Sequence, residues 1–207
     1  MDKADSMDID NQVNTDELFG HPKGLYICFA TELWERFSFY GMKYLLLLYL
    51  TKYHLFSDGE GLEVLGAYAG LVYTLPVIGG MLADRYLGMK KSVIFGGILL
   101  CLGHLLMAVE GHQAVQYAAG TILASDITLH NGAVLSAGTL LTETIKIQDL
   151  AALNVFYLAL SLIVVGVGFL KPNISTIVGQ LYSKDDPRRD SGFTIFYMGI
   201  NLGSFAA

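Results

Sequence analysis

Four long apolar segments, in which charged side chains are rare, restrict what this 207-residue chain can fold into. They cover residues 24–50, 65–82, 92–109 and 153–181. At a rise of about 1.5 Å per residue, each segment is long enough as a helix to cross a hydrocarbon core of roughly 30 Å. Only helices and closed barrels satisfy every backbone polar group in lipid, and the segments lack the alternation of barrel strands. The sequence therefore predicts an all-α, polytopic membrane protein.

The charged residues suggest how such a chain is oriented. Helices are predicted at 24–52, 62–86, 90–110, 152–182 and 192–207, after an acidic segment, 1–22, that we interpret as a disordered cytoplasmic tail. This arrangement puts most basic residues on one side: Lys3, Lys23, Arg85, Lys90, Lys91, Lys184, Arg188 and Arg189. Only Lys52 and Lys146 fall on the other side. By the positive-inside rule, the N-terminus is cytoplasmic. The expected location is the cell (cytoplasmic or inner) membrane.

The segment 111–151 allows two interpretations. A further helix there would bury Asp126, His130 and Asn131 in lipid and would move Lys184 and its basic neighbours to the outer side. The sequence around Asn131-Gly132 instead has partly alternating residues on both sides of a hairpin turn. We therefore expect an extracytoplasmic, β-like loop.

The first predicted helix carries a polar face. At 100° per residue, Glu32, Glu35, Arg36, Tyr40 and Lys43 share one side of the helix. Each charge at mid-membrane costs roughly 2.5–3.5 kcal/mol on insertion scales, so four together must face a wet cavity or one another. A buried ion pair that joins helices is the simpler alternative, although such a pair needs only two charges.

A second charge lies inside the fourth predicted helix. Lys171 is far from the helix ends, so its ammonium group cannot easily extend to the interface. Pro172, which follows it, removes a backbone donor and is expected to kink the helix. In the fifth helix, Tyr197 and Asn201 lie four residues apart on one face, where they can bind a polar solute.

Four motifs together resemble a known family. Gly80-x-x-x-Asp84-Arg85-x-x-Gly88-x-Lys90-Lys91 is similar to the loop signature of the major facilitator superfamily. Three further motifs resemble signatures of the proton-dependent oligopeptide transporters: Glu32-x-x-Glu35-Arg36-Phe-x-x-Tyr40-Gly, Gly-Phe-Leu-Lys171-Pro-Asn, and Phe-Tyr197-x-x-Ile-Asn201-x-Gly-Ser. The resemblance runs from about residue 20 to the last residue. It implies the first five transmembrane helices of the major facilitator superfamily fold, in a truncated chain.

The resemblance also implies roles for individual residues. Glu32, Glu35 and Arg36 match the group linked to proton coupling. Residues that match the substrate cavity are Arg36, Tyr40, Lys43, Tyr73, Lys171, Asn173, Tyr197 and Asn201. Residues with a conformational or packing role are Gly80, Asp84, Arg85, Gly88, Lys90, Lys91 and Pro172. Two positions depart from the family pattern: Phe39, where a second Tyr is common, and Lys43, where Arg is common.

The expected function is proton-coupled symport of di- and tripeptides into the cell by alternating access. In this mechanism the peptide carboxylate draws Lys171 or Arg36 away from a glutamate, and the glutamate then favours its protonated form. The expected partners are small peptides, the lipid bilayer and the missing C-terminal half of the transporter. Protons are the coupling ion, and neither a cofactor, a metal nor a nucleic acid is expected.

Three alternatives remain. The same fold could carry nitrate or another small anion. The chain could be a non-transporting membrane interaction module if it is naturally complete. An integral membrane enzyme is the weakest alternative, because the five histidines are scattered without a helical ligand pair or a nucleophile motif.

Overall fold

The computed structural model describes residues 17–129 and 132–207, which form two compact units. The first unit comprises the described part of Met1–Tyr40 together with Ser175–Ala207. The second unit is Gly41–Ile174. Two helices, α1 (Lys23–Leu48) and α4 (Leu150–Gln180), contribute to both units, and each unit is described by itself below.

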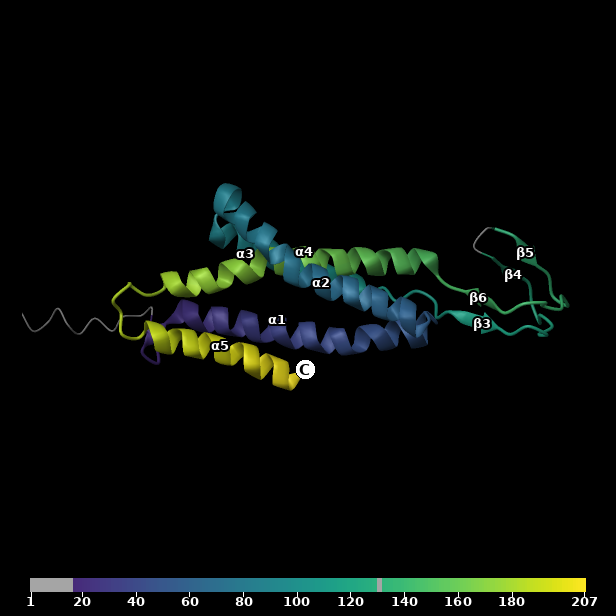
Figure 1. Cartoon of the computed structure of the whole chain (residues 1–207), viewed down its shortest axis with the longest axis horizontal. Helices are drawn as coiled ribbons and strands as arrows, with labels where there is room; N and C mark the ends of the chain where they lie inside the picture. The colour runs from purple at the N-terminus through teal and green to yellow at the C-terminus, as the bar shows by residue number, and fades with distance from the viewer. Residues whose placement is uncertain (1–16, 130–131) are drawn as a thin grey trace, which may run out of the picture. The chain divides into compact units, whose positions relative to one another are not determined.

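Helices account for most of the described chain (Figure 1). The helices and their π-helical continuations are α1 Lys23–Leu48, η1 Tyr49–Tyr53, α2 Asp58–Leu82, η2 Ala83–Leu87, α3 Met89–Met107, α4 Leu150–Gln180 and α5 Arg189–Ala206. The strands are β1 Glu17–Leu18, β2 His21–Pro22, β3 Val115–Tyr117, β4 Ile127–Thr128, β5 Val134–Leu135 and β6 Ile145–Ile147. The strands pair antiparallel as β1 with β2, β3 with β6, and β4 with β5.

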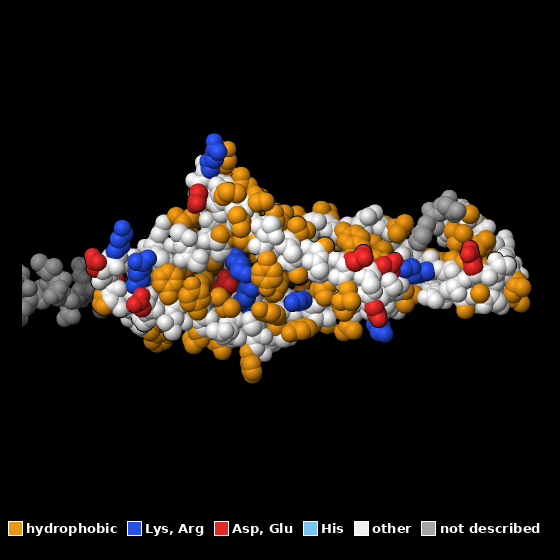
Figure 2. Space-filling view, viewed as in Figure 1, with side chains coloured by type: hydrophobic (Ala, Val, Ile, Leu, Met, Phe, Trp, Pro, Cys, Tyr) orange, Lys and Arg blue, Asp and Glu red, His pale blue; other side chains and the backbone are white. Residues whose placement is uncertain are grey.

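Three of the described helices are long and apolar enough to cross a membrane. They are α2 with η2 (Asp58–Leu87), α3 and α4. Figure 2 shows hydrophobic side chains spread over the helices, whereas most charged side chains gather near helix ends. α1 has the length of a membrane span at 26 residues, but its charged side chains set it apart from the other three.

The predicted helix ends differ from the observed ends where side chains cap the backbone. The second helix was expected to begin at 62, but α2 begins at Asp58. Ser57 and Glu60 form a capping box there, in which the Ser57 N–H donates to Glu60 Oε2 at 2.8 Å and the Glu60 N–H donates to Ser57 Oγ at 3.3 Å. Such reciprocal bonds satisfy the exposed donors of the first turn and therefore extend the helix upstream.

The prediction of disorder for the whole segment 1–22 was wrong for its last residues. Strands β1 and β2 pair there, and Arg188 fixes them from the far end of the chain. Its Nη1 donates to Glu17 Oε1 and to the Gly20 carbonyl, each at 3.0 Å. A contact between residues so distant in sequence leaves no local signal. Residues 1–16 lie outside the described residues, as do His130 and Asn131 of the expected hairpin turn.

Glycines allow α4 to approach α2 and α3 closely in the second unit. A Cβ on Gly96 of α3 would lie 2.6 Å from the Gly166 carbonyl oxygen, and a Cβ on Gly166 would lie 2.8 Å from that of Gly96. A Cβ on Gly79 of α2 would collide with the Gly168 carbonyl. Pro172 has no N–H to donate to the Gly168 carbonyl, which lies four residues before it. Gly79 of the neighbouring helix α2 lies against that carbonyl instead. α4 continues through Pro172 without a break.

Asp149 forms the N-terminal cap of α4. Its Oδ1 accepts the Ala152 N–H at 3.0 Å, and its Oδ2 lies 3.2 Å from both the ring Nδ1 and the backbone N of His112. These hydrogen bonds, that of Ala152 first, lower the pKa of Asp149 from 3.8 to about 2. The cap therefore fastens the loop after α3 to the start of α4.

The close contact at Gly96 predicts that Gly96→Ala destabilises the protein, by about 1–3 kcal/mol as for other overpacked sites. The matched control is Gly97→Ala, because a Cβ at Gly97 meets nothing within 4 Å. Thermal unfolding in detergent should show a lower midpoint for Gly96→Ala only. Equal midpoints for the two variants would contradict this packing.

The depressed pKa of Asp149 predicts a stability difference that depends on pH. The carboxylate stabilises the folded protein fully above its ordinary pKa of 3.8, and this contribution is lost as the pH falls through about 2. The unfolding midpoint of wild type should therefore exceed that of Asp149→Asn by a constant amount above about pH 4, and the gap should close towards pH 2. A gap that does not change with pH would refute the role of the charge.

Candidate functional site

One turn of α1 holds three ionisable side chains away from solvent. Glu32, Glu35 and Arg36 are only 2%, 7% and 4% exposed. Arg36 Nε lies 3.2 Å from Glu32 Oε1 and 2.5 Å from Glu35 Oε2. The spacing explains the contacts, because residues four apart are neighbours on a helix surface. Three residues of the expected polar face, Glu32, Glu35 and Arg36, thus form a compact ion cluster, and Lys43 of the same face lies in the second unit.

Aromatic side chains continue the cluster towards the next turn. The Arg36 guanidinium lies 5.4 Å from the ring centre of Phe39, and Phe39 meets Tyr40 edge-on at 5.1 Å. A cation over an aromatic face is attracted by the negative face of the ring, most strongly when both are desolvated. Phe39 is buried, and its apolar ring lies against the cation.

The fifth helix covers this turn at very short range. Figure 1 shows α5 beside the first part of α1. A Cβ on Gly199 would lie 2.9 Å from the Phe29 carbonyl oxygen, and a Cβ on Gly203 would lie 3.0 Å from Arg36 Cβ and collide with the Leu33 carbonyl. Gly203 belongs to the fifth-helix motif, and the structure gives a physical reason for a glycine there. Without a side chain, this position lets α5 lie directly against the residue that carries the guanidinium.

The cluster contains two carboxylates and one guanidinium, so its formal charge is −1 when all three are ionised. Arg36 Nη2 is buried and forms no hydrogen bond with any residue in 17–129 or 132–207. Buried ions recover their desolvation cost only when every charge is well paired. Such a cluster can exchange its pairing: it can take up a proton on a carboxylate, or an anion at the guanidinium.

The second unit holds another cation within a long apolar helix. Lys171 Nζ of α4 lies 5.6 Å from the ring centre of Tyr73 in α2, so this contact connects the two helices. The neighbouring Asn173 is buried, and its Nδ2 donates to the Phe169 carbonyl of its own helix at 2.7 Å. Asn173 was expected to bind substrate, but this amide is used inside the helix. Its expected role therefore has less support than that of Lys171.

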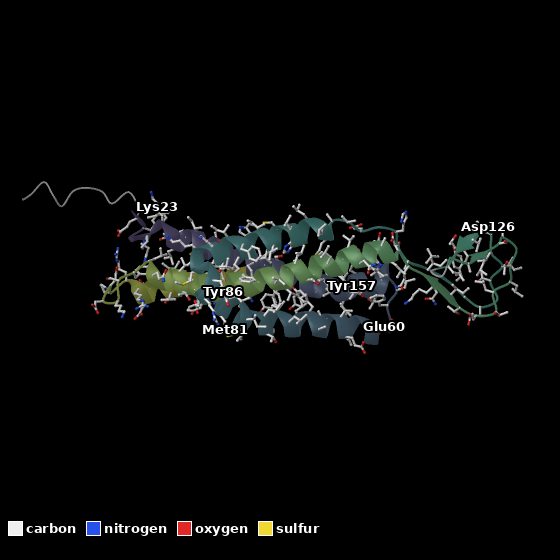
Figure 3. All side chains as sticks on the ribbon, turned by 90° about the horizontal axis from the view of Figure 1, so that it is seen from above. Lys23, Glu60, Met81, Tyr86, Asp126 and Tyr157 are labelled. Atoms are coloured by element: carbon white, nitrogen blue, oxygen red, sulfur yellow. The ribbon has the colours of Figure 1, made fainter. Side chains whose placement is uncertain are left out.

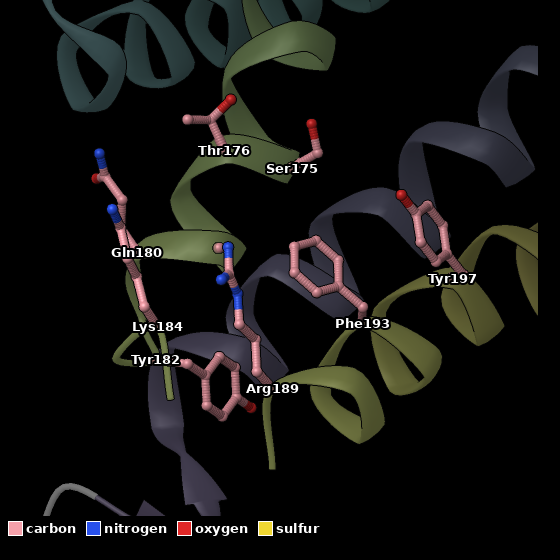
Figure 4. Close-up of a pocket in the computed structure, with 9 residues that line it drawn as sticks. Ser175, Thr176, Gln180, Tyr182, Lys184, Arg189, Phe193 and Tyr197 are labelled. Atoms are coloured by element: carbon pink, nitrogen blue, oxygen red, sulfur yellow. The ribbon is translucent and has the colours of Figure 1, made fainter. Parts of the chain in front are cut away.

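A cavity of about 580 Å³ lies between the end of α4 and the start of α5 in the first unit. Most of its lining residues are polar, and Figure 4 shows the side chains around it. The residues are Ser175, Thr176, Gly179, Gln180, Tyr182, Lys184, Arg189, Phe193 and Tyr197. Tyr197 was expected at the substrate cavity. From the sequence, Lys184 and Arg189 were considered only for membrane orientation, although their position just before the motif of the fifth helix is a signal that could have identified them.

Arg189 and Phe193 of α5 lie close to Gly179 of α4 in this cavity. A Cβ on Gly179 would lie 3.6 Å from Arg189 Nη2 and 3.5 Å from Phe193. Phe193 in turn stacks on Tyr197, with ring centres 6.1 Å apart. Asn201, one turn further along α5, is exposed, and its Nδ2 donates to the Tyr197 carbonyl at 3.2 Å.

The loop motif forms a sharp junction between α2 and α3. Asp84 and Arg85 lie in η2, whereas Lys90 and Lys91 lie in the first turn of α3. Between them, Gly88 has φ 76° and ψ 153°, a conformation that is essentially confined to glycine. Gly80 of the same motif lies against Pro172, since a Cβ there would be 3.5 Å from the proline Cβ.

The expected site residues therefore divide between the two units. The first unit contains the ion cluster, Tyr40, Tyr197 and Asn201. The second unit contains the remaining expected substrate residues, which are Lys43, Tyr73, Lys171 and Asn173. In the described parts of the chain, no group of three or more His, Cys, Asp or Glu side chains could hold a metal ion.

Three long apolar helices, and a further long helix, α1, that carries buried charged side chains, are typical of a multi-pass membrane protein. Comparisons with known proteins identify the family. Residues 90–207 match the POT family, and the chain belongs to that family. The prediction from the motifs is thus confirmed, and so is the helical fold of a POT transporter.

The matched relatives are transporters. The chain is 39% identical over 212 residues to the uncharacterized transporter YclF of Bacillus subtilis (strain 168), covering 100% of this chain and 35% of YclF. It is 39% identical over 198 residues to the di-/tripeptide transporter of Lactococcus lactis subsp. lactis (strain IL1403), covering 91% and 31%. A crystal structure of a peptide transporter POT in complex with sulfate matches with a TM-score of 0.68 and 38% identity, covering 91% and 31%. The chain spans about a third of the length of these relatives.

The ion cluster predicts an asymmetry between single and combined substitutions. Arg36→Met should destabilise the protein by about 3–5 kcal/mol, because it leaves two buried carboxylates without their cation. Replacing all three residues, as Glu32→Gln, Glu35→Gln and Arg36→Met, should recover most of that loss. Thermal unfolding in detergent measures both variants. A triple variant less stable than Arg36→Met would show that the side chains contribute by packing rather than by charge.

Proposed function

We propose that this chain is part of a carrier that moves di- and tripeptides across the cell membrane together with protons, by alternating access. The observation that carries the proposal is the buried cluster of Arg36 with Glu32 and Glu35 in α1. Membership of the POT family and similarity to a protein named as a di-/tripeptide transporter support the cargo. We also propose that the N-terminus is cytoplasmic, with Lys184, Arg188 and Arg189 on the same side.

The chemistry of a short peptide suits the groups that the chain supplies. A dipeptide is a zwitterion whose carboxylate is the same in every cargo, whereas its side chains vary. Cations within a membrane protein can bind that carboxylate through charge-assisted hydrogen bonds. Arg36 has a buried donor atom without a hydrogen bond to the described residues, and Lys171 supplies a second cation in the other unit. Tyr40, beside the cluster, supplies a hydroxyl for orientation.

Proton coupling follows from competition for the guanidinium. While Arg36 pairs with Glu32 and Glu35, it stabilises their ionised forms. A peptide carboxylate that binds Arg36 takes away part of that stabilisation, so that one glutamate binds a proton more readily. Peptide and proton would then cross together, and the release of one would favour the release of the other. The remainder of the carrier, which these relatives possess, would complete the alternating movement.

A small anion is the alternative cargo. The cavity between α4 and α5 contains Lys184 and Arg189, which would attract any small anion, and a related peptide transporter has been crystallised with sulfate. Unlabelled solutes competing with uptake of a labelled dipeptide by proteoliposomes separate the two cargos. We expect dipeptides to compete and nitrate or sulfate at equal concentration not to compete. The reverse order would favour the anion carrier.

The role of the cluster predicts a selective defect in Glu35→Gln. In proteoliposomes that contain the complete protein, this variant should lose uptake driven by a proton gradient and keep counterflow exchange of peptide, because it removes a proton acceptor and keeps the helix. Glu63→Gln is the matched control, since Glu63 is an exposed glutamate of α2. Normal proton-driven uptake by Glu35→Gln would remove Glu35 from the coupling mechanism.

A further inference from the structure

The loop between α3 and α4 contains the same sequence pattern twice. Residues 117–129 are Tyr-Ala-Ala-Gly-Thr-Ile-Leu-Ala-Ser-Asp-Ile-Thr-Leu, and residues 135–147 are Leu-Ser-Ala-Gly-Thr-Leu-Leu-Thr-Glu-Thr-Ile-Lys-Ile. The offset is 18 residues throughout. Ala-Gly-Thr, a leucine two residues later and an isoleucine four residues after that are identical in the two segments. We call the first segment repeat A and the second repeat B.

The backbone hydrogen bonds obey the same offset. The N–H of Gly120 donates to the Leu141 carbonyl at 2.8 Å, and the N–H of Gly138 donates to the Leu123 carbonyl at 2.8 Å. Each bond becomes the other when repeat A is exchanged for repeat B. A second exchanged pair is Leu123 N–H to Thr139 O at 3.0 Å and Leu141 N–H to Thr121 O at 2.9 Å. The two repeats are therefore related by a local two-fold axis.

Strand pairing places that axis. Strand β3 pairs with β6, and β4 pairs with β5. Exchanging repeat A for repeat B turns the first of these antiparallel pairs into the second. The same exchange replaces Ile122 by Leu140 and Leu140 by Ile122, so the bridge between them is unchanged. The two-fold axis therefore passes through this bridge. Both glycines of the shared Ala-Gly-Thr motif have a left-handed backbone, with φ 85° at Gly120 and 86° at Gly138.

Side chains follow the symmetry as well. The Ala119 N–H donates to Thr144 Oγ1 at 3.3 Å, and the Ala137 N–H donates to Asp126 Oδ1 at 2.7 Å. Thr144 and Asp126 are equivalent positions that accept the same backbone donor with different chemistry. The hydrophobic core also takes matching residues from each repeat: Leu123 with Leu141, Ile127 with Ile145, and Tyr117 with Leu135.

The two repeats and the strands that flank them, residues 115–147, form a unit that we call the module. The two ends of the module make different contacts. At the end next to the helices, Lys146 Nζ donates to the Leu55 carbonyl at 3.2 Å and lies 5.4 Å from the ring centre of Phe56. The equivalent of Lys146 in repeat A is Thr128. Gln148, two residues after Lys146, donates from Nε2 to the His54 carbonyl at 2.5 Å. Figure 3 places Asp126, near the other end, on the strands beyond the helices.

The His54 carbonyl lies at the C-cap of the helix formed by α1 and η1, and Leu55 is the residue that follows the cap. α1 and η1 end at Tyr53, and the last carbonyls of a helix need donors from elsewhere. Lys146 of the module and the flanking residues Ala114 and Gln148 supply donors to three successive carbonyls. The third of these bonds joins the Ala114 N–H to the Tyr53 carbonyl at 2.9 Å. A lysine ammonium is favourable there, since the C-terminus of a helix carries partial negative charge.

We infer that residues 115–147 are a duplicated β unit, and that its end at Lys146, together with the flanking Gln148, is a docking surface whose partner is the C-terminal end of the first helix. Residues common to both repeats make the fold of the module. Residues that differ between the repeats, Lys146 above all, form the surface that contacts the end of the helix. The module thereby fastens the end of the helix that carries Arg36, and this holds whatever the cargo is.

Exchanging residues between equivalent positions tests the dock. In the full-length protein in detergent, Lys146→Thr combined with Gln148→Ala should speed hydrogen–deuterium exchange at the His54 and Phe56 amides by about tenfold, the effect of losing a hydrogen bond to a charged group. Amides inside the module, such as those of Leu123 and Leu141, should keep their rates. Thr128→Lys, the matched control, should change neither set. Unchanged exchange at His54 and Phe56 would overturn the docking surface, as would equal acceleration within the module.

A second pair of variants tests the duplication. Gly120→Ala and Gly138→Ala each add a methyl group where nothing lies within 4 Å, so each acts only through the strained backbone. If the two repeats are equivalent, both variants should accelerate amide exchange across the module to the same extent. Acceleration by one variant only would show that the likeness of the two segments is superficial.

Discussion

The structure depends on keeping charge out of lipid. Each ionised side chain in the middle of a bilayer costs roughly 2.5–3.5 kcal/mol, and Glu32, Glu35 and Arg36 lie within one turn of α1. They offset that cost by pairing with one another and by being enclosed. The enclosure is a backbone feature, because Gly199 and Gly203 let α5 lie against the turn with no side chain between. The burial of the ion cluster in α1 therefore depends on the glycines of α5.

The second unit uses small residues for a similar purpose. Gly96 and Gly166 bring α3 and α4 together, and Gly79 fills the space beside the Gly168 carbonyl that Pro172 leaves without a hydrogen bond. Helices in a membrane gain little from burying apolar surface against one another, so close backbone approach is their main source of packing energy. Rigid packing of this kind is what a moving carrier needs if its helices are to shift as groups rather than bend individually.

The apolar segments were sufficient to predict helices, and the spacing of Glu32, Glu35 and Arg36 was sufficient to predict one charged face. Both follow from periods within a single helix. Contacts between distant residues could not be predicted: Arg188 with Glu17, and Gly203 with Arg36, depend on how the chain returns on itself. The loop of 111–149 is a different case. Its repeat was present in the sequence, and comparing the loop with itself would have found it without any structure.

The central claim is that peptide and proton compete for one buried guanidinium. The most direct test is proton uptake by the complete protein in weakly buffered detergent, followed with a pH-sensitive dye while a dipeptide is added. Wild type should take up protons when the peptide binds, and the variant with Glu32→Gln and Glu35→Gln should bind peptide without taking up protons. Peptide binding to wild type with no proton uptake, or equal uptake by the double variant, would contradict the account.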